Sequence, residues 1–397
     1  MSTVRFRSCA FVAILLVSAC DKKKDEAAEK GAEPPTTATP AAPAAATGDQ
    51  IAFASGAMFF KSADGTVKSW GVGSLVGDAP AEPRLKPGAV ADLANTKRLA
   101  VGGGQTMCAA MNDGSVKCWG NGASGELGDG KENEIDKPVV VPDVTNATAV
   151  AIGTYHVCAL IGDGTVKCWG NNGFQQASVE KKEKFVTPTA VPGITDAVLI
   201  TAGGDTSCAL GKDGSVKCWG FRCSFDQATD CSKPATIAAL AGATDIAAGW
   251  QSLCAVDKDA AVQCWGKNDE GQLGSGNTDS IDALSPVKGV SGATAVAAGQ
   301  MHWCALIKDG TVQCWGSNEY GQLGDGTLPE ADKNEFRATA APVKGVADAV
   351  ALSCGSGTCC AQIKDKSVKC WGENSSFFGE ANEETSNVAT PIVVTVQ

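Results

Sequence analysis

The segment Cys304–Gly316, CALIKDGTVQCWG, is one of seven similar copies along the chain and decides its fold. Each copy ends in a Trp-Gly pair, and successive pairs lie 46 to 56 residues apart. A period of this size is typical of repeat architectures, in which one unit is too small to bury its own apolar side chains. We expect the Trp-Gly tryptophans to pack between units; they are Trp70, Trp119, Trp169, Trp219, Trp265, Trp315 and Trp371.

Each copy has the pattern of a β-hairpin, because apolar residues alternate with more polar ones on both sides of a Lys-Asp-Gly turn. A three-residue loop that ends in Gly fits a type I turn followed by a left-handed residue. It places Cys304 opposite Cys314, at a pair without ladder hydrogen bonds and within disulfide reach. Ala260 and Lys366 replace the Gly in two copies. Since a positive φ is unfavourable for a residue with a Cβ, we expect those two turns to differ.

The rest of the unit supplies two further strands. A short apolar run that ends in Gly precedes the hairpin, and a Gly-rich loop with a Pro-Val segment follows it. Four short strands in about fifty residues make one propeller blade. We therefore predict an all-β protein, a seven-bladed β-propeller with four short antiparallel strands per blade, over residues 50–397. The apolar segments at its two ends, residues 51–55 and 390–396, could pair and so close the ring.

The pattern of Gly, His, Cys-Ala-Leu, Asp-Gly, Trp-Gly and Gly-Gln-Leu-Gly resembles the regulator-of-chromosome-condensation (RCC1) repeat, and it is matched most fully from Gly299 to Gly326. The resemblance covers nearly all of residues 50–397 and implies a seven-bladed propeller. The founding member is a nuclear guanine nucleotide exchange factor. We do not expect that activity here, because the N-terminus and the cysteines are those of an exported protein.

Residues 1–19 have the features of a secretory signal peptide, since Arg5 and Arg7 precede a short apolar run that lacks acidic residues. The run is too short for a spanning helix. It ends in Val-Ser-Ala-Cys20, which resembles the lipobox of bacterial lipoproteins, so we predict that Cys20 carries a lipid. An ordinary cleaved signal with an incidental Cys is the alternative. Residues 20–49 are then the lipidated Cys and a disordered tether, because they offer almost no large apolar side chain.

The predicted location is therefore extracytoplasmic, with the protein lipid-anchored to the bacterial cell envelope, and the sequence leaves open which membrane holds the anchor. Of 18 cysteines, Cys9 leaves with the signal and Cys20 takes the lipid. The even remainder indicates a disulfide framework. The predicted bridges are Cys108 to Cys118, Cys158 to Cys168, Cys208 to Cys218, Cys254 to Cys264, Cys304 to Cys314, Cys360 to Cys370, Cys223 to Cys231 and Cys354 to Cys359.

Metal binding and catalysis are not predicted. Zinc sites use closely spaced cysteine pairs with further Cys or His, whereas nine residues separate the hairpin cysteines and the chain has two histidines. His156 and His302 share one repeat position, which holds Thr or Ser elsewhere, so we expect a hydrogen bond to the backbone of a neighbouring blade. Asp129 and Asp325 suggest calcium, but their spacing is not that of an EF-hand. We predict no catalytic residue, no metal and no cofactor.

The formal net charge of −11 argues against a nucleic-acid ligand. Acidic residues gather in the loops after Trp-Gly, either as a solubilising rim or to attract a basic partner. The repeats differ most in loops 221–233 and 327–341, which are candidates for recognition, with tolerated drift as the alternative. Trp250 and Trp303 are unique to their repeats and could line a channel mouth or simply pack. The candidate partner-binding residues are Phe221, Arg222, Phe225, Trp250, Trp303, Tyr320, Glu330 and Asp332.

The sequence thus favours a lipid-anchored, monomeric, non-catalytic module that binds an unidentified protein, with a basic protein as one candidate. A cell-envelope enzyme acting on carbohydrate or peptide is the first alternative, and it would need acids that converge in the channel. A purely structural envelope protein is the second.

Overall fold

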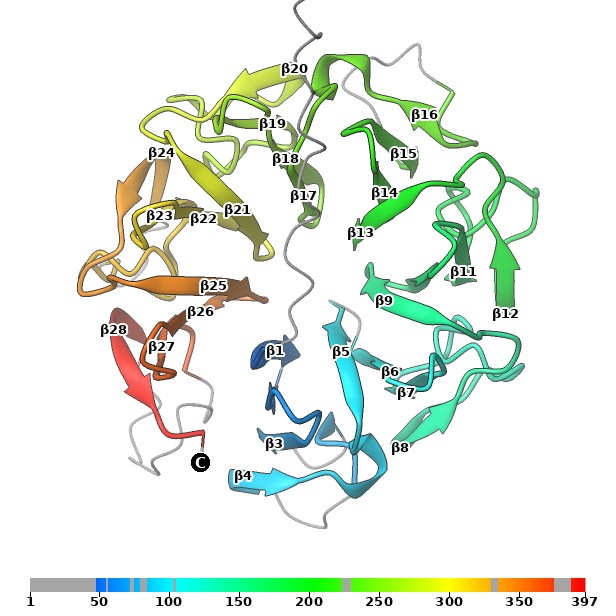
Figure 1. Cartoon of the computed structure of the whole chain (residues 1–397). Coiled ribbons are helices and arrows are strands. Elements are labelled where there is room, and N and C mark those ends of the chain that lie inside the picture. The colour runs from blue at the N-terminus through cyan, green and yellow to red at the C-terminus, as the bar shows by residue number, and fades with distance from the viewer. Residues whose placement is uncertain are drawn as a thin grey trace, which may run out of the picture. The chain divides into compact units, whose positions relative to one another are not determined.

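A computed structural model describes residues 48–54, 56–71, 75–78, 84–102, 105–221, 223, 230–329, 335–374 and 387–396. These residues form seven four-stranded antiparallel sheets, which are the blades of a ring around a central channel (Figure 1). The prediction of an all-β, seven-bladed propeller is confirmed.

Every blade is a meander of four consecutive strands, numbered from the channel outward. Blade 1 has β1 (Gln50–Ala54), β2 (Ala57–Lys61), β3 (Val67–Gly71) and β4 (Arg84–Ala89); blade 2 has β5 (Thr96–Val101), β6 (Thr106–Met111), β7 (Val116–Gly120) and β8 (Ile135–Val140). Blade 3 has β9 (Ala147–Ile152), β10 (His156–Ile161), β11 (Val166–Asn171) and β12 (Lys184–Ala190); blade 4 has β13 (Ala197–Gly203), β14 (Thr206–Gly211), β15 (Val216–Gly220) and β16 (Ala235–Thr236).

The other three blades follow the same order. Blade 5 has β17 (Asp245–Ala248), β18 (Ser252–Val256), β19 (Val262–Gly266) and β20 (Ile281–Pro286). Blade 6 has β21 (Ala293–Ala298), β22 (His302–Ile307), β23 (Val312–Ser317) and β24 (Phe336–Pro342); blade 7 has β25 (Ala349–Cys354), β26 (Thr358–Ile363), β27 (Val368–Gly372) and β28 (Val388–Val394). Two short 3₁₀ turns, η2 (Ala91–Leu93) and η3 (Ala238–Leu240), complete the elements, and in the described part of the chain no helix has the length and hydrophobicity of a membrane span.

The meander gives the ring two different faces. The turns between first and second strands and the long loops between third and fourth strands lie at one end of every blade, which we call the loop face. The Lys-Asp-Gly hairpin turns lie at the opposite end, which we call the turn face. Of the variable segments 221–233 and 327–341, the described residues 221, 223, 230–233 and 327–329 follow third strands and lie at the loop face, whereas residues 336–341 belong to β24, so that part of the predicted loop is a strand.

In the described residues the ends of the chain do not exchange strands, so the suggested pairing of the terminal segments is wrong. β1 is the innermost strand of blade 1, and β28 is the outermost strand of blade 7. Since β28 already pairs with β27, each blade is complete from one stretch of chain. Side chains close the ring instead: Gln362 Nε2 in blade 7 donates to Asp49 Oδ2 at 3.2 Å, and Ile51 packs in one apolar cluster with Cys360 and Val394.

The turns at Ala260 and Lys366 do not differ from the others, contrary to the prediction. Gly310 has φ of 80° and donates its N–H to Ile307 O, while Ala260 and Lys366 reach φ of 60° and 73° and make the equivalent bonds. The strand pairs on both sides fix the register of these hairpins. Their pairing outweighs the roughly 1 to 2 kcal/mol that a left-handed residue with a Cβ requires.

The Trp-Gly tryptophans are buried between blades, as expected, and tie each blade to the one before it. The indole Nε1 of Trp315 donates to the carbonyl of Gln272 at 2.9 Å, in the loop of blade 5. Because this carbonyl comes from the Gly-Gln-Leu-Gly motif, the two most constant parts of the repeat meet each other across the interface. The equivalent bonds run from Trp119 to Leu75, Trp169 to Glu126, Trp219 to Gln176 and Trp371 to Gln322.

The described residues contain eight disulfides, at the pairs that the sequence predicted. Cys304 and Cys314 are register partners of β22 and β23, with Cα atoms 4.1 Å apart. Such a bridge holds the second and third strands of a blade together and so resists local opening of the hairpin.

Candidate protein-binding face

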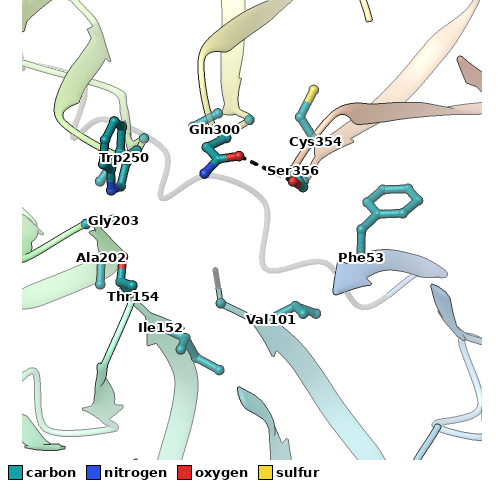
Figure 2. Close-up of a pocket in the computed structure, with 18 residues that line it drawn as sticks. Phe53, Val101, Ile152, Thr154, Ala202, Gly203, Trp250, Gln300, Cys354 and Ser356 are labelled. Carbon is teal, nitrogen blue, oxygen red and sulfur yellow. Dashed lines mark hydrogen bonds between the residues drawn. The ribbon is translucent and has the colours of Figure 1, made fainter. Parts of the chain in front are cut away.

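The channel opens at both faces of the ring. At the loop face it forms a cavity of about 340 Å³, lined by first-to-second-strand turns and bordered by Trp250, Gln300 and Cys354 (Figure 2). At the turn face it forms a cavity of about 600 Å³, lined by the innermost strands. These are the places where a ligand or a partner segment could enter the channel.

The carboxylates described in the turn-face cavity are engaged in structural bonds. Asp49 accepts hydrogen bonds from Ala63 N at 2.7 Å and from the blade 7 side chain that closes the ring. Asp245 Oδ2 accepts from Val296 N at 2.9 Å and so joins the innermost strands of blades 5 and 6. Burial is the largest effect on Asp245 and raises its pKa to about 6, although the charge of Arg98 acts in the opposite direction. This cavity therefore gives no support to an acid–base pair of catalytic carboxylates.

Side chains at the repeat position of the two histidines make two kinds of hydrogen bond. His156 Nε2 lies 2.8 Å from Ser207 Oγ of the next blade, and Ser207 in turn bonds the carbonyl of Gln176. Where the position is Thr, as at Thr106 and Thr358, its hydroxyl donates instead to a carbonyl of its own blade. The predicted hydrogen bond to the backbone of a neighbouring blade is therefore wrong, because both histidine rings contact side chains of the next blade.

Trp303 does not line a channel mouth, so its prediction as a partner-binding residue is wrong. It is 1% exposed and lies in the layer between blades 5 and 6. Its indole Nε1 donates to Ser252 Oγ at 3.1 Å. Ser252 stands at the histidine position of blade 5, and the tryptophan fills the space that a smaller residue leaves there.

Aromatic side chains lie on the loop face of blades 3 to 5, exposed in blades 3 and 5 and half-buried in blade 4. Tyr155 is 45% exposed, Phe174 is 50% exposed and Trp250 is 39% exposed. The rings of Phe174 and Phe221 lie 4.8 Å apart, so blades 3 and 4 share one aromatic pair. Lys267 Nζ lies 4.9 Å from the Trp250 ring and supports it from one side. We call Tyr155, Phe174, Phe221 and Trp250 the aromatic set.

Acidic groups gather around Tyr320 on the loop face. Burial raises the pKa of Glu373, and the neighbouring Glu319 raises it further. Burial also raises the pKa of Tyr320, and the charges of Glu319, Glu373 and Glu270 act in the same direction. These glutamates belong to blades 5 to 7, whereas the aromatic set belongs to blades 3 to 5.

The repeats match a known family model. The model described as "Regulator of chromosome condensation (RCC1) repeat" matches residues 113–160, 259–306 and 309–362, and a second model of that description matches 147–176, 243–272 and 293–322. The chain is an RCC1-like repeat β-propeller. No curated protein sequence matches it.

Solved structures show the same fold for this RCC1-like propeller. In the crystal structure of Kap60 bound to yeast RCC1 (Prp20), the matching chain has a TM-score of 0.74 and 20% identity, with 94% of this chain and 91% of that chain covered. Prp20p from Saccharomyces cerevisiae gives 0.70, 23% identity and coverage of 82% and 85%. Human WBSCR16 gives 0.67, 21% identity and coverage of 77% and 85%.

The predicted partner-binding residues of the RCC1-like propeller are only partly brought together. Trp250 is exposed on the loop face, and Phe221 is half-buried against Phe174. Tyr320 is half-buried in blade 6, at the repeat position of Phe174, and its backbone N–H donates to Gln322 Oε1. Outside the described residues lie Arg222, Phe225, Glu330, Asp332 and the predicted lipidation site Cys20.

Tyr155 and Phe174 were not among the predicted residues. Tyr155 occupies a turn position where other repeats of the RCC1-like propeller have Gln, Asp, Met or Gly, and Phe174 occupies the position of Tyr320. A comparison of residue types at these loop positions would have singled out both as aromatic, but not as exposed. The two calcium candidates make bonds within the protein: Asp129 accepts a hydrogen bond from Lys131 N, and Asp325 forms an ion pair with Arg337.

Glu126 is an anomaly among these loops of the RCC1-like propeller. It stands where other blades have Gln176, Gln272 and Gln322, and each of these side chains accepts the N–H two residues before it. Glu126 Oε2 makes the same bond, from Ser124 N at 2.7 Å, but in the described structure its Oε1 is buried without a partner. Burial therefore raises the pKa of Glu126.

We expect Glu126→Gln to raise the free energy of unfolding at pH 7.5 by about 1 to 2 kcal/mol, because it removes a buried carboxylate oxygen that lacks a hydrogen bond. The folded pKa of Glu126 lies above its unfolded value, so the ionised group destabilises the fold above that folded pKa. As the pH falls through it, the carboxyl protonates and the advantage of Gln should shrink. Urea denaturation at pH 7.5 and pH 4.5 measures both effects. The reverse change Gln176→Glu is the control and should destabilise; equal stability of all three proteins would contradict the interpretation.

Proposed function

We propose that this RCC1-like propeller is an extracytoplasmic, lipid-anchored, non-catalytic module that binds another protein on its loop face. The observation that carries the proposal is the aromatic set on three consecutive blades. Aromatic residues are enriched at protein interfaces, and large apolar side chains that stay exposed together commonly mark a binding surface. Propeller loops on a rigid ring can present such side chains without ordering them on binding.

The charge of the loop face indicates the chemistry of the partner. Glu270, Glu319 and Glu373 lie near Tyr320 on the loop face of blades 5 to 7, and the chain as a whole is acidic. A partner segment that combines apolar side chains with Lys or Arg would satisfy both regions. Known proteins with this fold are described with partners: yeast RCC1 with Kap60, and Prp20p with Gsp1p and histones.

The proposed location rests on the N-terminal sequence and the disulfides. Residues 1–19 have the pattern of a signal peptide that ends at a lipobox, and Cys20 would carry the lipid. Residues 20–49 would then be a tether between the lipid and the propeller. Eight disulfides in one domain are compatible with an oxidising compartment outside the cytoplasm.

The test is a crosslinking pull-down from intact envelopes with variants of the full chain. The wild type should capture a stoichiometric partner, and Trp250→Ala and Phe174→Ala should each reduce its recovery roughly 10-fold or more, as expected for aromatic residues at the centre of an interface. Val140→Ala is the matched control, because Val140 is 58% exposed on the outer strand β8, away from the loop face. Its recovery should equal that of the wild type.

Two outcomes would overturn the proposal. Recovery of the same partner by all variants would place binding elsewhere, and failure to recover any stoichiometric partner would favour a structural role. Cys20→Ala, assayed by fractionation, tests the anchor separately. It should move the protein from membranes to the soluble fraction, and retention in membranes would show that Cys20 is not the anchor.

A further inference from the structure

His302, Cys354 and Cys359 bring three potential metal ligands together between blades 6 and 7. Among the described residues, their ligand atoms lie within 4.8 Å of one another. His302 Nε2 is 3.0 Å from Cys359 Sγ. Cys354 and Cys359 are register partners of β25 and β26 and form a disulfide. The spacing of these residues in the sequence gave no sign of this cluster, because 57 positions separate His302 from Cys359.

The imidazole of His302 is held in a fixed orientation. The side chain is fully buried, and a Cβ on Gly299 would lie 2.0 Å from its Cε1, so only Gly leaves room for the ring. In the described structure Nδ1 has no hydrogen-bond partner, and Nε2 is aimed at the sulfur of Cys359. A fixed imidazole that faces sulfur is already placed as a ligand before any metal arrives.

Cys354 gives this cluster a route to solvent. It is half-buried and borders the cavity at the loop-face mouth of the channel (Figure 2). The cysteines of the six hairpin bridges are 0% or 1% exposed. Thiol–disulfide exchange requires access to a sulfur, so a reductant should reach the Cys354–Cys359 bridge before the hairpin bridges. The Cys223–Cys231 bridge is the comparison, because Cys231 is also half-buried.

We propose that reduction of the Cys354–Cys359 disulfide creates a binding site for a thiophilic d¹⁰ cation, Zn²⁺ or Cu⁺, with Cys354 Sγ, Cys359 Sγ and His302 Nε2 as ligands. A protein dithiol or a phosphine supplies the two electrons: the S–S bond breaks, two thiols form, and the dithiol becomes a disulfide or the phosphine with water becomes its oxide. The cation then displaces both thiol protons as two metal–sulfur bonds form. In the metal-bound state neutral His302 carries its proton on Nδ1, which leaves the Nε2 lone pair for the metal.

The donor set suits this class of cation. Thiolate and imidazole ligands select Zn²⁺ and Cu⁺ over the hard cations Mg²⁺ and Ca²⁺. Two sulfurs and one nitrogen complete a three-coordinate Cu⁺ site, whereas Zn²⁺ would take a fourth ligand, such as water from the channel mouth.

The interface between blades 3 and 4 contains the same arrangement without the cysteines and supplies a matched control. His156 faces Ser207 as His302 faces Cys359, and Ala202 stands at the position of Cys354. The variant Cys354→Ala/Cys359→Ser therefore copies a residue combination that already packs in this protein. It removes both sulfur ligands while the other seven bridges remain.

The test starts with limited reduction of the full chain by a phosphine, followed by alkylation and peptide mass spectrometry to locate the thiols. We expect Cys354 and Cys359 to be labelled before any hairpin cysteine. After removal of the reductant, the reduced protein is titrated with Zn²⁺ alone and, in a separate anaerobic arm, with Cu⁺ against a competing chelator. We expect one equivalent to bind, with affinity at least about 100-fold higher than that of the Cys354→Ala/Cys359→Ser variant treated in the same way.

His302→Ala should weaken binding roughly 10-fold to 100-fold, whereas His156→Ala should not change it. Preference between the two cations is read from the two arms. The proposal is overturned if the hairpin cysteines are reduced first, if neither cation binds the reduced wild type, or if the double variant binds equally well. A proposal about partner binding at the loop face does not depend on this result.

Discussion

Trp315→Ala is expected to lower the free energy of unfolding by about 4 kcal/mol, the largest effect of any single substitution that we predict. Trp315 is 0% exposed and packs in the apolar cluster between blades 5 and 6, with Leu273 and Trp303. Replacing a buried Trp by Ala removes its transfer free energy and leaves a cavity, which together typically cost about 3 to 5 kcal/mol. The measurement is equilibrium denaturation of the oxidised protein.

Trp315→Phe separates packing from hydrogen bonding in the same interface. It keeps most of the ring but removes the Nε1 donor to the Gln272 carbonyl, so we expect a loss of about 1 to 2 kcal/mol. Val393→Ala, at a side chain that is 63% exposed, is the surface control and should change little. If Ala and Phe at position 315 cost the same, the hydrogen bond rather than the packing would hold the blades together.

Acid is expected to destabilise the propeller through His156 by about 3 kcal/mol between pH 7.5 and pH 4. Burial lowers the folded pKa of His156 to about 3, against an ordinary value of 6.5. The folded state therefore keeps the imidazole neutral while the unfolded state takes up a proton. The stability that this group contributes is complete above pH 6.5 and is lost as the pH falls from 6.5 toward 3.

His156→Thr is the matched variant for this measurement, because Thr fills the same position in three other blades and Ser207 keeps its bond to Gln176. Denaturation curves at pH 7.5, 5 and 4 should show that the wild type loses about 3 kcal/mol more than the variant by pH 4. The comparison cancels the contributions of Asp245 and other carboxyls, which both proteins share. Parallel pH profiles of the two proteins would mean that His156 is protonated in the folded state.

The Gly-rich loops show where prediction from the sequence stopped. The sequence predicted a Gly-rich loop at Gly-Gln-Leu-Gly but no role for its Gln. The Gln carbonyl accepts the indole N–H of the next blade, and the Gln side chain accepts an N–H of its own loop. Trp303 shows the same limit, since its burial depends on Ser252, which lies 51 positions away in a different blade. Exposure of Phe174 and Tyr155 was likewise invisible, because a sequence does not tell which loop residues the ring covers.

The sequence by itself determined the repeat, the hairpins, the number of blades and the pairing of the hairpin cysteines. These follow from contacts between residues about ten positions apart, and a local alternation of apolar side chains with a turn fixes such contacts. Only the tertiary structure decided how blades meet: which side chain faces His156 or His302, how the ring closes at Asp49, and that Cys354, Cys359 and His302 form one cluster. Those contacts join residues about fifty or more positions apart, and their identity is set by the geometry of the closed ring rather than by any spacing along the chain.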